Sequence, residues 1–234
     1  MESTRESVVK LERPRTLLEF QKMNEDIYGD MNRKRYSDEE IVRRFLEEIL
    51  GMMEPMRKDD REAFKTQLPK IFSWYCALAN RQGINLQEAL WYKYPGVCPY
   101  CLRDESCYCG VEHPKIPKEE KEDSLRKFRR ERIGREPIVF KDHQALHARL
   151  YKGQNARILP FQIADHIGEE AKEVSEALRH NDKKAFCDEM ADVLSWLFAV
   201  ATRLELSLDD LMWKLYPYEC EKCHKDRCAC PEKI

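Results

Sequence analysis

Two long helical patterns occupy the second half of the chain. Apolar residues recur at steps of three and four over residues 163–178 and again over 186–204. An α-helix turns about 100° per residue, so each set forms one apolar stripe along a helix. The stripes consist of Ile163, Ala164, Ile167, Ala171, Val174 and Leu178, then Phe186, Met190, Val193, Leu194, Leu197, Ala201 and Leu204. With Asn181 and Asp182 as the turn, we expect an antiparallel helix pair.

Shorter helical segments flank this pair. One is expected near residues 138–152, and another over 208–216 with Ser207 as its N-cap. Together with the central pair they make a four-helix module that ends in a cluster of cysteines. One helix pair cannot bury both of its apolar faces, so we expect two such modules to pack together.

The same pattern occurs earlier in the chain, at a constant offset of 122 residues. Residues 61–101 align without a gap to residues 183–223, with 13 identities in 41 positions. The sequence therefore predicts an all-α protein of two tandem four-helix modules packed as a pseudo-dimer, each followed by a small zinc knuckle. The first module spans 1–113, a charged linker spans 114–136 and the second module spans 137–234.

Composition narrows the class of protein. Of the 234 residues, 42% are hydrophobic, enough for a packed core, and the net charge is only −2. This charge balance argues against a generic nucleic-acid or membrane-surface binder. The longest apolar stretch, residues 193–201, is too short to span a bilayer, and residues 1–15 lack the apolar core of a signal peptide. A cytoplasmic protein with no membrane partner is expected.

The linker is the most highly charged part of the chain. Residues 114–136 carry 15 charges in 23 positions, which is typical of a solvated linker or a short exposed helix. Its basic run, residues 126–132, could contact phosphates, but a solvated face is the favoured interpretation.

Eight of the ten cysteines form two tight clusters. The first cysteine cluster, residues 98–109, and the second, residues 220–230, each show Cys-x-x-Cys followed by Cys-x-Cys. In a reducing compartment this spacing predicts a tetrathiolate site for structural zinc, with iron less favoured. The ligands would be Cys98, Cys101, Cys107 and Cys109 in one site, and Cys220, Cys223, Cys228 and Cys230 in the other. Cys76 and Cys187 lie in apolar helical patterns, where buried inert thiols are expected.

Acidic residues border the apolar stripes of the central helix pair. Glu170 and Glu173 are one turn apart, and Glu189 and Asp192 repeat this spacing on the next helix. If the helices pack antiparallel, the four carboxylates converge and would bind Mg²⁺ or Mn²⁺. The alternative is that they are ordinary exposed acids on two charged helices.

These acidic residues also carry a family resemblance. The runs GEEAKEV (168–174) and DEMADVLSWL (188–197) resemble the EExxE…ExxD signature of the all-α nucleoside triphosphate pyrophosphohydrolases of the MazG type, and the ending WKLYPYECEKC resembles MazG-like proteins with a cysteine knuckle. The resemblance implies a helical fold that works as a dimer or larger assembly. It also implies Mg²⁺-dependent hydrolysis of a nucleoside triphosphate to the monophosphate and pyrophosphate, in nucleotide-pool house-cleaning.

Site residues follow from the same resemblance. Glu170, Glu173, Glu189 and Asp192 would be the Mg²⁺ ligands, and Glu169 a further ligand or the catalytic base that orients water. Candidates for base recognition are Trp196, Asn155 and Trp74, each with a structural role as the favoured alternative. Candidates for phosphate binding are Lys172 and Arg157.

The first module departs from the pattern. It keeps Glu47 and Glu48, but Gly51, Gln67 and Lys70 stand where the second module has Glu173, Glu189 and Asp192. We expect this module to act as a structural partner, leaving one working site in the internal pseudo-dimer; a further homo-oligomer is possible. The competing function is a catalytically inactive, zinc-stabilised helical module that binds nucleotides or proteins. A nucleic-acid-binding role of the knuckles is disfavoured by the balanced charge.

Overall fold

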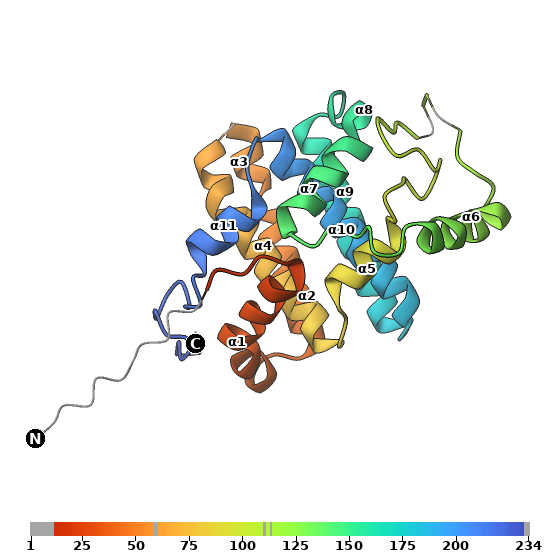
Figure 1. Ribbon diagram of the computed structural model, residues 1–234. Helices are drawn as coiled ribbons and strands as arrows, with labels where there is room; N and C mark the ends of the chain where they lie inside the picture. The colour runs from red at the N-terminus through yellow and green to blue at the C-terminus, as the bar shows by residue number, and fades with distance from the viewer. Residues whose placement is uncertain (1–11, 59, 110, 113, 232–234) are drawn as a thin grey trace, which may run out of the picture.

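The computed structural model describes residues 12–58, 60–109, 111–112 and 114–231. Over these residues the chain forms eleven α-helices and no strand (Figure 1), which confirms the all-α prediction. They are α1 (Leu17–Arg35), α2 (Asp38–Leu50), α3 (Met53–Lys58), α4 (Arg61–Arg81), α5 (Leu86–Lys93), α6 (Lys118–Glu131), α7 (Phe140–Leu150), α8 (Lys152–Asn155), α9 (Pro160–Arg179), α10 (Lys183–Arg203) and α11 (Leu208–Leu215). The outer ends of the predicted modules, residues 1–11, 113 and 232–234, lie outside the described part.

The predicted central pair is α9 and α10. Pro160 begins α9 at a position where its missing N–H costs nothing. Asn181 makes the turn with a left-handed φ of 52°, and the Asp182 side chain then accepts a hydrogen bond from the Ala185 amide at 2.9 Å. Ser207 precedes α11 as predicted, but its hydroxyl donates to the Asp209 carboxylate and does not cap the helix.

Helix bounds repeat at the offset seen in the sequence. Helices α4 and α10 start and end 122 residues apart, and so do α5 and α11. The caps repeat as well, because Asp60 accepts from the Ala63 amide at 3.0 Å just as Asp182 does from Ala185.

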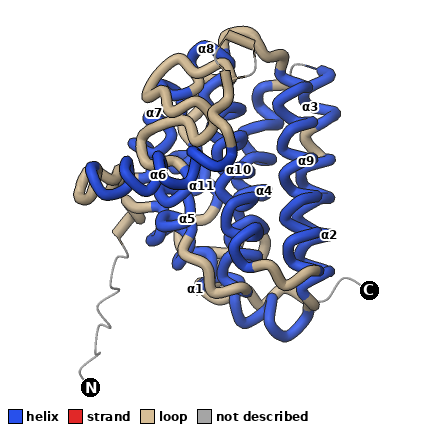
Figure 2. Tube along the Cα trace, turned by 90° about the vertical axis from the view of Figure 1, so that its right-hand side faces the viewer, coloured by secondary structure: helices blue, strands red, loops and turns tan. Residues whose placement is uncertain are grey.

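One hydrophobic core extends through both halves of the chain. Helix α10 packs against α9, α7 and α5, while α4 packs against α1, α2 and α11. The ring of Phe140 lies 5.3 Å from those of Phe20 and Phe72 and 5.9 Å from that of Phe198, so aromatic contacts join the halves. Figure 2 shows α2, α3 and α9 along one side of the molecule, where α9 contacts both of the others.

Each cysteine cluster packs on the first long helix of the other half. The Cys107 amide donates to the Leu150 carbonyl at 2.6 Å, at the end of α7. The Cys228 amide donates to the Ile27 carbonyl at 2.7 Å, within α1. The two halves are thus joined by reciprocal contacts as well as by the core.

The charged segment between the halves folds as α6. Lys121, Leu125 and Arg129 follow each other at four-residue steps and share one face of this helix. Leu125 is buried, so this face packs against the protein and only the remainder is solvated. The segment thus forms a short helix, one of the two expected forms, and only the face that carries Leu125 departs from the expected exposure.

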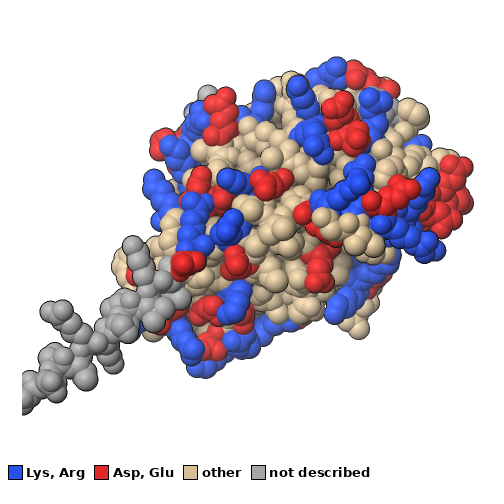
Figure 3. Space-filling model, viewed as in Figure 1, with Lys and Arg blue, Asp and Glu red and all other residues tan. Residues whose placement is uncertain are grey.

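The surface carries both signs of charge. Figure 3 shows lysines and arginines interspersed with aspartates and glutamates over the face that it presents, including the region of α6. None of the described helices is both long enough and apolar enough to span a bilayer.

Candidate metal centre

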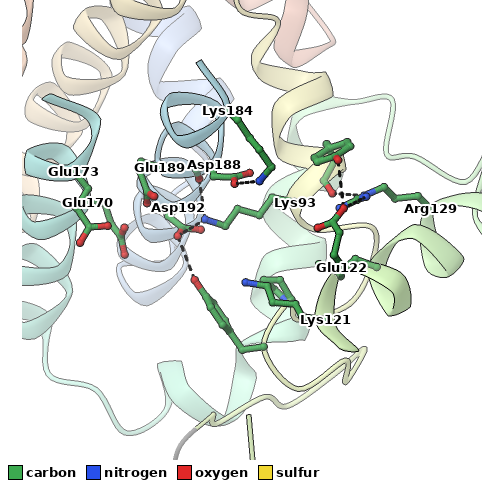
Figure 4. A pocket seen from close by; sticks show the side chains of 14 residues that line it. Lys93, Lys121, Glu122, Arg129, Glu170, Glu173, Lys184, Asp188, Glu189 and Asp192 are labelled. Atoms are coloured by element: carbon green, nitrogen blue, oxygen red, sulfur yellow. Dashed lines mark hydrogen bonds and ion pairs between the residues drawn. The ribbon is translucent and has the colours of Figure 1, made fainter. Parts of the chain in front are cut away.

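A cavity of about 300 Å³ lies between the acidic face of the α9–α10 pair and a wall made by α5, α6 and the first cysteine cluster. Figure 4 shows the side chains that line it. They are Tyr92, Lys93, Pro99, Tyr100, Lys121, Glu122, Leu125, Arg129, Glu170, Glu173, Lys184, Asp188, Glu189 and Asp192. One wall therefore comes from the second half of the chain, and the other from the first half and the linker.

Three of the predicted acids meet in this cavity. One carboxylate oxygen from each of Glu170, Glu173 and Glu189 lies within 4.8 Å of the others, which suits a shared metal ion. Burial raises the pKa of Glu170 to about 8 and that of Glu189 to about 7. The Trp196 indole N–H donates to Glu170 at 3.3 Å, so this ring orients one of the three carboxylates.

The fourth predicted ligand, Asp192, is held separately. Its carboxylate accepts hydrogen bonds from the Lys93 ammonium at 2.5 Å, from the Tyr94 hydroxyl and, at 3.4 Å, from the Tyr100 hydroxyl. Asp192 and Lys93 are both buried, and the Lys93 ammonium also donates to the Asp188 carbonyl at 2.9 Å. The structure thus places Asp192 in a buried ion pair beside the three glutamates, and not among them.

Glu169 does not line the cavity. Its side chain is 69% exposed and lies 3.0 Å from the Nδ1 atom of His166. The His166 ring in turn stacks on Trp196, with ring centroids 4.4 Å apart. Trp74, the counterpart of Trp196 in the first half, packs edge-on against Tyr36.

The remaining substrate-binding candidates also lie outside the cavity. Lys172 is exposed and pairs with Glu176 at 3.0 Å, while Arg157 pairs with Glu112 at 2.5 Å. Asn155 ends α8, and its Oδ1 atom has no hydrogen-bond partner among the described residues. The structure does not bring these three side chains to the acidic group.

Four cations line the cavity: Lys93, Lys121, Arg129 and Lys184. Only Arg129 lies in a segment that the sequence singled out for phosphate contacts, the basic run 126–132, and the three lysines were missed. Lys184 forms an ion pair with Asp188 at 2.8 Å, and Arg129 forms one with Glu122 at 3.0 Å. Asp188 and Glu122 are therefore each paired with a cation of the cavity. Lysines and an arginine facing three converging carboxylates form a site with both a cation-binding and an anion-binding side.

At the corresponding position in the first half, the side chains bind one another or a residue of the second half. The Gln67 amide donates to the Glu48 carboxylate at 2.9 Å, and Lys70 lies 3.8 Å from Glu221. Among the described residues, no group of three acids gathers at this place.

Both cysteine clusters bring four sulfur atoms together. Within each cluster the Sγ atoms lie within 4.8 Å of one another, and Cys98 and Cys109 approach to 3.4 Å. Tetrahedral zinc with Zn–S bonds of about 2.3 Å separates its sulfurs by about 3.8 Å. The Cys220 and Cys230 sulfurs lie 3.8 Å apart, while those of Cys107 and Cys109, at 3.1 Å, are closer together than in such a site. All ten cysteines are free thiols; Cys76 is buried as expected, but Cys187 is partly exposed.

Comparison with known proteins gives one match. The family model described as MazG nucleotide pyrophosphohydrolase domain matches residues 160–216, which span α9, α10 and α11. No curated protein matches the chain, and no solved structure does. A domain of this family is therefore detected over the helices that carry the acidic group, and it indicates nucleotide pyrophosphohydrolase activity at the level of the family.

Proposed function

We propose that the protein hydrolyses nucleoside triphosphates to the monophosphate and pyrophosphate, with Mg²⁺ or Mn²⁺ held by Glu170, Glu173 and Glu189. The observation that carries the proposal is the convergence of these carboxylates inside the matched domain. Among the described residues, no lysine or arginine forms an ion pair with any of the three. The direct test is the formation of monophosphate and pyrophosphate by the purified protein. House-cleaning of the nucleotide pool is the cellular role that goes with this reaction.

The donor set fits a hard divalent cation. It consists of carboxylate oxygens alone, two of them on half-buried side chains whose raised pKa values reflect unfavourable ionisation without a cation. When bound, Mg²⁺ supplies charge neutralisation of the triphosphate and a more acidic bound water.

Lys93 is suited to stabilise the leaving pyrophosphate. Two of its three N–H groups are used by Asp192 and by the Asp188 carbonyl, so one remains for a phosphate oxygen. The buried ion pair with Asp192 fixes the ammonium in place. In this proposal Asp192 positions Lys93, a role that differs from the metal ligation implied by the family resemblance.

The tandem duplication belongs to the same proposal. Supporting contacts recur in both halves: Tyr94 meets Tyr151 edge-on at 6.2 Å between ring centroids, and Tyr28 meets Tyr216 edge-on at 5.9 Å. The modules of residues 1–113 and 137–234 would form a pseudo-dimer with one working site. The first module then supplies one wall of that site from α5 and the first cysteine cluster.

Each cysteine cluster is proposed to bind one structural zinc ion. The sulfur positions support it, and so does the short chain around them, which buries little apolar surface of its own. A reducing compartment such as the cytoplasm would keep the eight thiols available to the metal.

Replacement of Glu48 by glutamine should leave hydrolysis within about twofold of the wild type, since surface substitutions outside a site cost little. Glu48 is the counterpart of Glu170, but Gln67 and Lys70 stand at the positions of the acids of α10. The Gln67 amide donates a hydrogen bond to Glu48. Steady-state rates of pyrophosphate release measure the effect. A loss of activity comparable to that of Glu170→Gln would mean that the first module has a working site of its own.

Stabilisation by Mg²⁺ should increase as the pH rises through about 7 to 8. The folded protein holds protons on Glu189 and Glu170 up to pKa values of about 7 and 8, whereas the unfolded chain loses them near the ordinary value of 4.5. Without metal, the stability of the folded protein therefore falls as the pH rises from the ordinary value of 4.5 to about 7 to 8. Below about 7 to 8, a metal ion has to displace protons from these two carboxyl groups in order to bind. Thermal melting with and without Mg²⁺, at about pH 6 and about pH 8.5, measures the difference. An equal shift at both values would contradict this account.

A further inference from the structure

Lys121 stands apart from the other cations of the cavity. Lys93, Arg129 and Lys184 each pair with an acid. Lys121 forms no ion pair within the described part of the chain, although it lines the same cavity. Figure 4 shows its ammonium end directed into the cavity, on the wall opposite the glutamates.

The position of Lys121 is set by two neighbours. Leu125, one turn along α6, is buried and anchors this face of the helix. The Lys121 ammonium lies 4.6 Å from the centroid of the Tyr100 ring, a cation–π contact. Tyr100 is itself fixed in the first cysteine cluster, where its amide donates to the Cys98 sulfur at 3.4 Å and its carbonyl accepts from the Ile116 amide at 2.7 Å.

The environment of Lys121 is unfavourable for a cation without a counter-charge. The side chain is partly buried, and burial together with the nearby Lys93 ammonium lowers its pKa, although the Asp192, Asp188 and Glu122 carboxylates act in the opposite direction. A cation–π contact attracts the ammonium but does not neutralise its charge. An anion bound in the cavity would supply the missing partner.

We propose that Lys121 binds a phosphate group of a nucleoside triphosphate on the wall of the cavity opposite Glu170, Glu173 and Glu189. This inference rests on the proposed function and adds to it a substrate-binding residue from the linker. A cavity of about 300 Å³ is at the lower end of small-molecule sites, which suits the phosphate chain. The phosphate chain would be held between carboxylates of the second module and a cation of α6.

The test compares Lys121→Met with Lys127→Met, an exposed lysine of the same helix that lies outside the cavity lining. Loss of one charge-assisted contact should raise KM for the triphosphate about 10- to 100-fold in Lys121→Met, with a smaller change in kcat. Lys127→Met should match the wild type, and Lys121→Arg should recover most of the affinity. Binding of Mn²⁺ alone, followed by electron paramagnetic resonance, should be unchanged in Lys121→Met, because the metal ligands are untouched.

The outcomes separate this inference from the proposed function. A wild type that hydrolyses triphosphates, together with an unchanged KM in Lys121→Met, overturns the inference and leaves the function standing. If the wild type hydrolyses no triphosphate, the function fails, and calorimetry with pyrophosphate and Mg²⁺ decides the binding role instead. Weaker pyrophosphate binding by Lys121→Met than by the wild type supports the inference; equal or absent binding overturns it.

Discussion

Glu173→Gln is expected to lower kcat for pyrophosphate release by about 10²–10³-fold. Glutamine keeps the size of the side chain but removes one of the three negative charges that converge on the metal position. Loss of that charge weakens the binding of the metal ion, and the charge of the triphosphate is then incompletely neutralised. The measurement is the initial rate of pyrophosphate release at saturating nucleotide and Mg²⁺.

Glu176→Gln is the matched control. Glu176 lies one turn further along α9, is partly exposed, and pairs with Lys172 instead of facing the cavity. Its substitution should leave the rate within about twofold of the wild type. A Glu173→Gln protein that hydrolyses at the rate of this control would contradict the assignment of the metal site.

Cys101→Ser should have the second largest effect, because it removes one ligand of the first cysteine cluster. We expect the zinc content to fall from about two ions to about one per chain, and Tm to fall by about 10 °C or more. Hydrolysis should also fall strongly, because Tyr100, next to Cys101, contacts both Asp192 and Lys121. Metal analysis, thermal melting and hydrolysis rates measure the three effects.

The repeat provides a matched control for this prediction. Cys223 occupies the position of Cys101 in the second cysteine cluster, which packs on α1 and lies away from the cavity. Cys223→Ser should lose zinc and stability to a similar extent but keep more of the activity of the folded protein. A wild-type protein that folds without zinc, or equal loss of activity in the two variants, would contradict the account.

The helices of the second half could be predicted because their signals are local. The apolar stripes of α9 and α10 recur at helical steps, and Asp182 marks the start of α10. The convergence of Glu170, Glu173 and Glu189 follows from one-turn spacing and the packing of two neighbouring helices. Each of these inferences uses residues close in sequence.

The opposite wall could not be predicted in this way, because it comes from distant parts of the chain. Asp192 was expected to join the glutamates, but Lys93 binds it from the other half. The repeat held a signal for this pairing: Lys93 stands where the second half has Leu215, and Lys70 stands where it has Asp192. The sign of the charge is reversed between Lys70 and Asp192, and the charge of Lys93 is lost at Leu215, so the two halves differ where Lys93 and Asp192 meet.

The inward face of α6 could not be predicted, because the charge content of the segment hides its helical pattern. Leu125 lies four residues from both Lys121 and Arg129, and this spacing places the three on one face. In a segment with 15 charges, such a face cannot be told from a solvated one by composition. Only the packed structure shows which charges turn inward.

Phosphorus NMR of the products tests the central claim most directly. The wild-type protein would be incubated with Mg²⁺ and each of a panel of canonical and modified nucleoside triphosphates. At least one is expected to be converted to equal amounts of monophosphate and pyrophosphate, with no orthophosphate and no reaction without a divalent cation. Formation of the nucleoside diphosphate and orthophosphate, or no turnover of any member of the panel, would contradict the proposed reaction.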